Sequence, residues 1–134
     1  MSQAPYILLC DDEAHILHVL GLKLQEAGYR VLMARDGVEG LALAREHQPL
    51  LVITDYLMPK MDGLALCQNL RTESAAHLID FVLLTARGAT LDDNLLDELE
   101  FSAMFSKPFS PREVVHHVQK QVPLDVSISK GPSE

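Results

Sequence analysis

The chain has 134 residues, of which 48% are hydrophobic and 22% are charged, and its formal net charge is -8. This length and composition fit a single globular domain and exclude a disordered chain. The eleven Lys and Arg residues form no run, and the negative net charge disfavours binding to nucleic acid or to anionic membrane surfaces.

The chain contains two cysteines, and both lie in apolar surroundings. Cys10 ends an apolar run and Cys67 falls in a helical pattern, so we expect small buried hydrophobic residues rather than disulfide partners. The first ten residues have no basic leader, and their apolar stretch is too short to span a membrane. We therefore expect a cytoplasmic protein.

Short apolar runs alternate with helical patterns along the chain. Runs without polar alternation are typical of strands that are buried on both faces of a parallel sheet. The expected strands are Tyr6–Cys10, Arg30–Ala34, Leu50–Thr54, Ile79–Leu84 and Ser102–Ser106. A helical pattern follows each of them, and the expected inward-facing residues are Ile16, Leu20 and Leu24, then Val38, Leu41 and Ala42, then Leu64, Cys67 and Leu70, then Leu91, Leu95 and Leu99, and finally Val114, Val118 and Val122.

Capping residues mark the ends of several expected helices. The first helical pattern runs from Asp11 to Ala27, and Gly28 stands just past its end. Asp36 is expected to cap the second helix and Thr90 the fourth. The run Ser110-Pro111-Arg112-Glu113 has the form of a capping box with proline at the first helical position.

Five strands alternating with five helices predict an α/β fold. Strand-helix-strand crossovers are almost always right-handed, so the helices should cover both faces of a parallel sheet. Residues 1–122 are expected to form this domain. After Pro123 the pattern stops, and residues 123–134 are expected to be a C-terminal tail or the start of a linker.

Polar side chains follow four of the expected strands at the point where each strand ends. Asp11 and Asp12 follow the first strand, Asp55 the third, Thr85 the fourth and Lys107 the fifth. Ligands of open parallel sheets bind beyond the carboxyl ends of the strands, so we expect these side chains to converge. Each of these residues, taken alone, is commonly a helix cap or a loop residue. Only their joint position indicates a shared site.

Three carboxylates crowded together repel each other unless a cation lies between them. Mg²⁺ suits such a site because it takes carboxylate ligands and keeps several waters. With a cation bound, a carboxylate can act as a nucleophile toward phosphorus, as in enzymes that form aspartyl phosphates. The Lys107 ammonium and the Thr85 hydroxyl can then stabilise the phosphoryl oxygens. The cluster therefore predicts phosphoryl transfer to a carboxylate.

Four motifs together give the sequence a resemblance to a known family. They are the acidic pair Asp11-Asp12, the run from Ile53 to Gly63, the segment Leu84-Thr85-Ala86 and the segment Lys107-Pro108-Phe109. In this order and spacing they resemble the response-regulator receiver domains of two-component signalling, and the resemblance covers about residues 5 to 122. It implies a flavodoxin-like, doubly wound sheet of five parallel strands in the order 2-1-3-4-5, with five helices.

The resemblance also implies a role for each residue of the predicted site. Asp55 matches the phosphoacceptor, Lys107 matches the lysine that pairs with the phosphoryl group, and Thr85 matches the hydroxyl that moves toward it. Pro108 matches a proline that is typically preceded by a cis bond. The implied ligands of a Mg²⁺ or Mn²⁺ ion are Asp12, Asp55, the backbone carbonyl of Leu57 and, through a water, Asp11.

The sequence departs from the family pattern at the residues that report the phosphorylated state. Thr85 matches one part of this switch, but Met104 stands where receivers usually carry Tyr or Phe. Phe105 should face the opposite side of the strand, so it does not replace the missing ring. Leu57 and Arg87 occupy two variable positions beside the site, and we expect Arg87 to lie in solvent.

The resemblance implies a cytoplasmic signalling module rather than an enzyme in the usual sense. A sensor histidine kinase or phosphotransfer protein would donate its phosphoryl group to Asp55 in a Mg²⁺-dependent, self-catalysed reaction. The new charge would shift a conformational equilibrium and so regulate an output. The expected partners are the phosphodonor and a downstream effector domain or protein, but neither nucleic acid nor a membrane, and a phosphorylation-dependent dimer is left open.

Two functions of other classes stand as alternatives. A hydrolase with an aspartate nucleophile, of the haloacid dehalogenase type, needs a second acid two residues after the nucleophile, where this chain has Leu57. A pseudo-receiver would bind partners without being phosphorylated. The intact acidic pair and Lys107 count against the pseudo-receiver, whereas Met104 counts in its favour.

Overall fold

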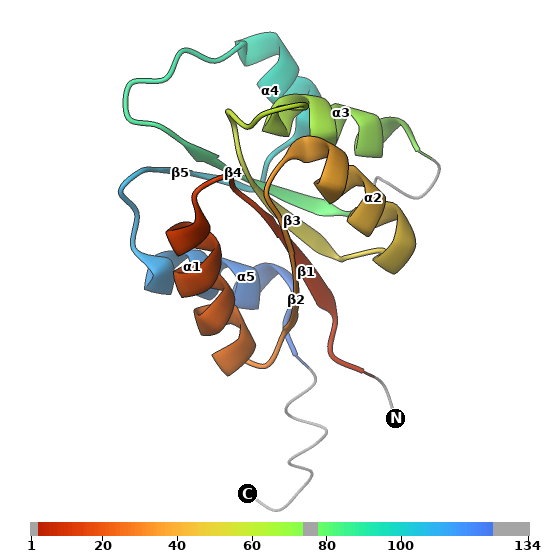
Figure 1. Cartoon of the computed structure of the whole chain (residues 1–134), viewed down its shortest axis with the longest axis vertical. Helices are drawn as coiled ribbons and strands as arrows, with labels where there is room; N and C mark the ends of the chain where they lie inside the picture. Colours follow the sequence, from red (N-terminus) through yellow and green to blue (C-terminus); the bar gives the residue numbers. More distant parts are fainter. Residues whose placement is uncertain (1–2, 74–77, 125–134) are drawn as a thin grey trace, which may run out of the picture.

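A computed structural model describes residues 3–73 and 78–124 and shows a sheet of five parallel strands (Figure 1). The order of the strands in the sheet is β2-β1-β3-β4-β5. The predicted flavodoxin-like sheet is confirmed, and each strand begins and ends within one residue of its predicted bounds. The strands are β1 (Tyr6–Cys10), β2 (Arg30–Ala34), β3 (Leu51–Asp55), β4 (Asp80–Thr85) and β5 (Ala103–Ser106).

Helices form one layer on each face of the sheet (Figure 1). The helices α1 and α5 cover one face, and α2, α3 and α4 cover the other. This arrangement follows from right-handed crossovers between parallel strands, which place successive helices on the two faces as the strand order reverses. The helices are α1 (Ala14–Glu26), α2 (Gly37–His47), α3 (Gly63–Thr72), α4 (Asp93–Leu99) and α5 (Pro111–Gln121).

The two faces of the sheet bury separate hydrophobic cores, because successive strand residues point to opposite sides. In β1, Leu9 packs with the core under α1 and α5, whereas Leu8 packs with the core under α2 and α3. In β3, Ile53 and Val52 divide in the same way, and all four side chains are fully buried. Each such burial stabilises the fold by about 1.5–3 kcal/mol.

The predicted capping residues are right at α2 and α5 and wrong at α4. The side chains of Asp36 and Ser110 each accept the backbone N–H of the third residue after them. At α4 the N-cap is Asp92, not Thr90, and the Asp92 carboxylate accepts two N–H groups of the first turn. Asp92 prevails because its carboxylate both caps the helix and interacts favourably with the positive end of the helix dipole.

Two further helix predictions are wrong in detail. The first helix begins at Ala14 rather than Asp11, because the Asp11 N–H still donates to a β2 carbonyl and so continues the sheet. In α2, Leu41 is buried as predicted, but Val38 and Ala42 are exposed. The inward face of α2 is formed by Leu41 together with small residues, which let the helix lie close to the sheet.

The predicted tail, residues 123–134, lies outside the described residues except for Pro123 and Leu124. Leu124 packs against the core under α1 and α5. Among the helices of residues 3–73 and 78–124, none combines the length and the apolar character that a membrane span requires.

Candidate functional site at the carboxyl edge of the sheet

The register of the strands aligns their carboxyl ends at one edge. Asp55 is the last residue of β3 and pairs with Leu84, which directly precedes Thr85. Asp11 directly follows β1, and Lys107 directly follows β5. The side chains that follow the ends of the strands in the sequence therefore all leave the sheet at the same edge.

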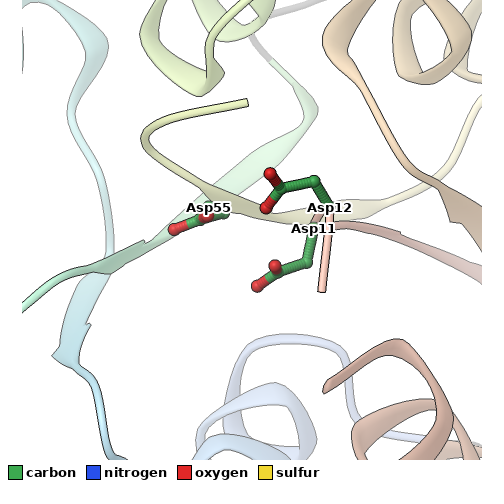
Figure 2. Close-up of side chains that lie close together, drawn as sticks. All are labelled: Asp11, Asp12 and Asp55. Atoms are coloured by element: carbon green, nitrogen blue, oxygen red, sulfur yellow. The ribbon is translucent and has the colours of Figure 1, made fainter. Parts of the chain in front are cut away.

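Three carboxylates converge at this edge (Figure 2). Asp11, Asp12 and Asp55 each contribute one oxygen, and these atoms lie within 4.8 Å of one another. Asp11 is fully buried and Asp55 is 7% exposed, whereas Asp12 is exposed. Within the described part of the chain, no other group of three His, Cys, Asp or Glu residues could share a metal ion in this way.

The ammonium group of Lys107 lies among the carboxylates. Its Nζ atom is 3.0 Å from Oδ2 of Asp11 and 3.4 Å from Oδ2 of Asp55. Its shortest contact, 2.7 Å, is with Oε2 of Glu13. The peptide bond between Lys107 and Pro108 is cis, as the resemblance implied.

Burial and mutual repulsion make the buried carboxylates hard to ionise. Burial, and after it the negative charge of Asp11, raises the pKa of Asp55 to about 6, although Lys107 acts against both. Burial also raises the pKa of Asp11, against the hydrogen bond from the Glu13 backbone and the charge of Lys107. Burial alone would lower the pKa of Lys107, but its acidic neighbours raise that pKa above its usual range. One ammonium therefore does not neutralise the site.

One buried carboxylate oxygen of Asp11 has an ion pair with Lys107 but no other polar contact among the described residues. Oδ1 accepts the backbone N–H of Glu13 at 2.9 Å. Oδ2 is near the ammonium of Lys107, but that contact does not have hydrogen-bond geometry, and the oxygen accepts no hydrogen bond from the described residues. A set of three carboxylate oxygens within 4.8 Å of one another, with one ammonium beside it, fits a hard divalent cation such as Mg²⁺.

The loop between β3 and α3 lies close against the end of β3. A Cβ atom at Gly63 would overlap the carbonyl oxygen of Asp55, so a larger residue would push the loop away from the site. The Gly63 N–H donates to the carbonyl of Tyr56 at 2.7 Å, and Asp62 caps α3. The side chain of Leu57, at the start of this loop, is 62% exposed.

The other predicted site residues lie on or directly after the strands β4 and β5. Thr85 is buried at the end of β4, and its carbonyl accepts the backbone N–H of Lys107 at 2.8 Å. Met104 is 51% exposed beside α4, whereas Phe105 packs with the core under α5. The prediction that these neighbours face opposite sides is confirmed, and Arg87 is exposed as predicted.

Glu13 also lies at this site, although no motif in the sequence predicts it there. It is the N-cap residue of α1, yet its carboxylate makes the shortest ion pair of Lys107. The one signal in the sequence is the run of three consecutive acids, Asp11, Asp12 and Glu13. Nothing in that run reveals a contact with a lysine 94 positions away.

Comparison with known proteins supports the resemblance that the motifs indicate. Residues 7–119 match the family described as the response regulator receiver domain. The "Probable transcriptional regulator ycf27" of Porphyra purpurea is 41% identical over 113 residues, which are 84% of this chain and 45% of that protein. The alkaline phosphatase synthesis transcriptional regulatory protein PhoP of Bacillus subtilis is 39% identical over 108 residues, 81% of this chain and 44% of that protein.

A solved structure shows the same fold. The signal receiver domain of a signal transduction histidine kinase from Syntrophus aciditrophicus is 30% identical with a TM-score of 0.79, and the match covers 89% of this chain and 90% of that one. The chain spans less than half the length of the curated relatives that it matches. The match over residues 7–119, the strand order and the acidic pocket agree, and the chain belongs to the response regulator receiver domain family.

Proposed function

We propose that this chain receives a phosphoryl group on Asp55 from the phosphohistidine of a sensor histidine kinase or a phosphotransfer protein. The observation that carries the proposal is the meeting of three acidic side chains and one ammonium at the carboxyl end of β3. Membership of the receiver domain family supports it, because receivers act in two-component signalling.

The proposal includes a divalent cation, Mg²⁺ or Mn²⁺, at the acidic cluster. Asp12, Asp55 and the backbone carbonyl of Leu57 would hold the ion, and Asp11 would bind it through a water. The oxygen-only donor set, whose three carboxylates face a single ammonium, supports this assignment. When bound, the ion supplies positive charge that offsets the repulsion among the carboxylates and stabilises the phosphoryl oxygens.

Asp55 would act as the nucleophile in its ionised form. One of its carboxylate oxygens forms a bond to phosphorus while the bond from phosphorus to the donor nitrogen breaks. The electron pair of that bond leaves with the donor imidazole, which takes up a proton. Lys107 and the Thr85 hydroxyl would contact the transferred phosphoryl oxygens. Attack by water later restores the Asp55 carboxylate and releases inorganic phosphate. In this proposal the chain promotes its own modification and is not an enzyme in the usual sense.

The added charge would shift a conformational equilibrium that Thr85 and Met104 report to an output. An effector domain or protein is the proposed downstream partner, because the curated relatives named as transcriptional regulators are more than twice as long as the matched region. Residues 1–122 would form the receiver and residues 123–134 a tail or linker. We place the reaction in the cytoplasm, whose reducing conditions suit the two free, buried cysteines.

Phosphorylation by a small phosphodonor tests the proposed function. The purified chain is incubated with acetyl phosphate and Mg²⁺, and its intact mass is measured. We expect the mass to increase by one phosphoryl group, and we expect no increase after Asp55→Asn or in excess EDTA. An unchanged mass of the wild-type chain would contradict the proposal and favour a pseudo-receiver that only binds partners. An equal mass increase in the Asp55→Asn variant would contradict the assignment of Asp55 as the phosphoacceptor.

A further inference from the structure

Lys107 has three acidic neighbours, and the shortest of these contacts is not with the proposed phosphoacceptor. Nζ donates to Oε2 of Glu13 at 2.7 Å, whereas Oδ2 of Asp55 lies at 3.4 Å. Charge-assisted N–H···O hydrogen bonds usually measure about 2.7–2.9 Å. In this state the ammonium is therefore hydrogen-bonded to Glu13 and paired with Asp11 at 3.0 Å, and it is only near Asp55.

The Glu13 carboxylate is not needed to begin α1. Glu13 is the N-cap residue, but its side chain makes no capping hydrogen bond among the described residues. Glutamate is also not among the residues preferred at an N-cap. Its side chain is 48% exposed, whereas that of Lys107 is 16% exposed, so the pair is formed at the outer side of the site.

The proposed reaction requires Lys107 to contact phosphoryl oxygens on Asp55. An ammonium has three donors, and here the shortest of its three carboxylate contacts is with Glu13. Moving Nζ onto the phosphoryl group means lengthening or breaking this ion pair. An ion pair that is shorter in the unphosphorylated chain than in the transition state would slow the transfer.

We infer that Glu13 is a positioning residue that holds Lys107 away from Asp55, so that phosphoryl transfer proceeds only as the Glu13–Lys107 ion pair opens. The inference rests on the proposed function and adds a restraint within the same site. Glu13 touches neither phosphorus nor the attacking oxygen and acts through Lys107. It sets the rate of self-phosphorylation below the rate that the other residues allow.

The rate of phosphorylation by acetyl phosphate tests the inference. In this reaction an Asp55 oxygen bonds to phosphorus as acetate leaves with the electron pair of the broken P–O bond. Glu13→Gln removes the charge and keeps the size, and we expect the rate constant to rise about two- to fivefold, the range expected for one partly exposed ion pair. The matched control is Glu113→Gln, an exposed glutamate in the first turn of α5, which should leave the rate unchanged.

The phosphorylation rate is measured in about 0.5 M salt, where the Debye length falls to a few ångströms and long-range interactions with the anionic donor are screened.

A double-mutant cycle of urea unfolding with Glu13→Gln and Lys107→Met gives the coupling free energy between the two side chains. We expect a favourable coupling together with the faster reaction. An unchanged or slower reaction of Glu13→Gln, or a faster one without coupling, would overturn the inference. If the wild-type chain is not phosphorylated at all, it is the proposed function that fails.

Discussion

Asp55 combines two properties that oppose each other in a nucleophile. Its burial beside Asp11 raises its pKa to about 6, which disfavours the ionised form that the proposed attack on phosphorus requires. The same burial excludes water from a carboxylate that would otherwise be strongly hydrated. The proposed cation would resolve this conflict, because its positive charge would restore the ionised carboxylate without exposing it to solvent.

Replacing Asp55 by Asn is expected to stabilise the metal-free chain at neutral pH. The pKa of Asp55 is about 6 in the folded chain and about 3.9 in an unfolded one, so its ionisation removes stability as the pH rises from about 4 to about 6. The Asn variant has no such loss. Its free energy of unfolding should exceed that of the wild type by about 1–3 kcal/mol near pH 7.5, and the difference should nearly vanish near pH 4. Urea unfolding in EDTA at both pH values measures this, and a variant no more stable at the higher pH would contradict the raised pKa.

Leu57 is expected to lengthen the lifetime of the phosphorylated chain. Its side chain is 62% exposed at the start of the loop that follows Asp55, where an apolar group hinders the approach of water. Leu57→Ala should speed the loss of phosphate about two- to tenfold, which corresponds to a lowering of the barrier by up to about 1.4 kcal/mol. The decay of phosphorylated protein is followed by intact mass. Leu50→Ala, at a leucine that is 48% exposed and precedes β3, is the control, and equal decay rates in both variants would count against the role.

At the scale of elements, the central strands β1, β3 and β4 are predicted well because continuous apolar runs favour strands that are buried on both faces of a parallel sheet. Ile53 and Val52 could not both be buried in a sheet with one solvated face. Helix starts are predicted less well, because they depend on which of several nearby polar residues caps the first turn. Asp92 prevails over Thr90 in α4. The ion pair between Glu13 and Lys107 is not predictable, since it depends on the packing of distant segments.

The carboxyl end of α4 offers a test of local backbone strain. Glu100 follows the helix with a φ of 56° in the left-handed region, which disfavours residues with a Cβ atom. Glu100→Gly should therefore raise the free energy of unfolding by about 0.5–1 kcal/mol, since glycine adopts this conformation readily. Glu98→Gly, inside the same helix, should lower it by a similar amount. Urea unfolding compares the two variants, and destabilisation by both would show that Glu100 is not strained.

At the scale of the whole molecule, the proposed cation site would couple ion binding to folding, because its carboxylates lie at the ends of two different strands. The carboxylates of Asp11, Asp12 and Asp55 are brought together only in the folded chain, so an ion that binds them stabilises the native state. Mg²⁺ should raise the free energy of unfolding by about 1.4 kcal/mol for each tenfold excess over its dissociation constant. Asp12→Asn should weaken this effect, whereas Asp97→Asn, at an exposed acid of α4, should preserve it. A Mg²⁺ effect of the same size in both variants would argue against the site.

The identity of the modified residue tests the central claim most directly. The chain is treated with acetyl phosphate and Mg²⁺ and then with borohydride, which reduces an aspartyl phosphate to homoserine, and its peptides are sequenced by mass spectrometry. We predict homoserine at position 55 and at no other aspartate. Homoserine at Asp11, Asp12 or Asp62 instead, or its absence from a chain that has gained a phosphoryl group, would contradict the account.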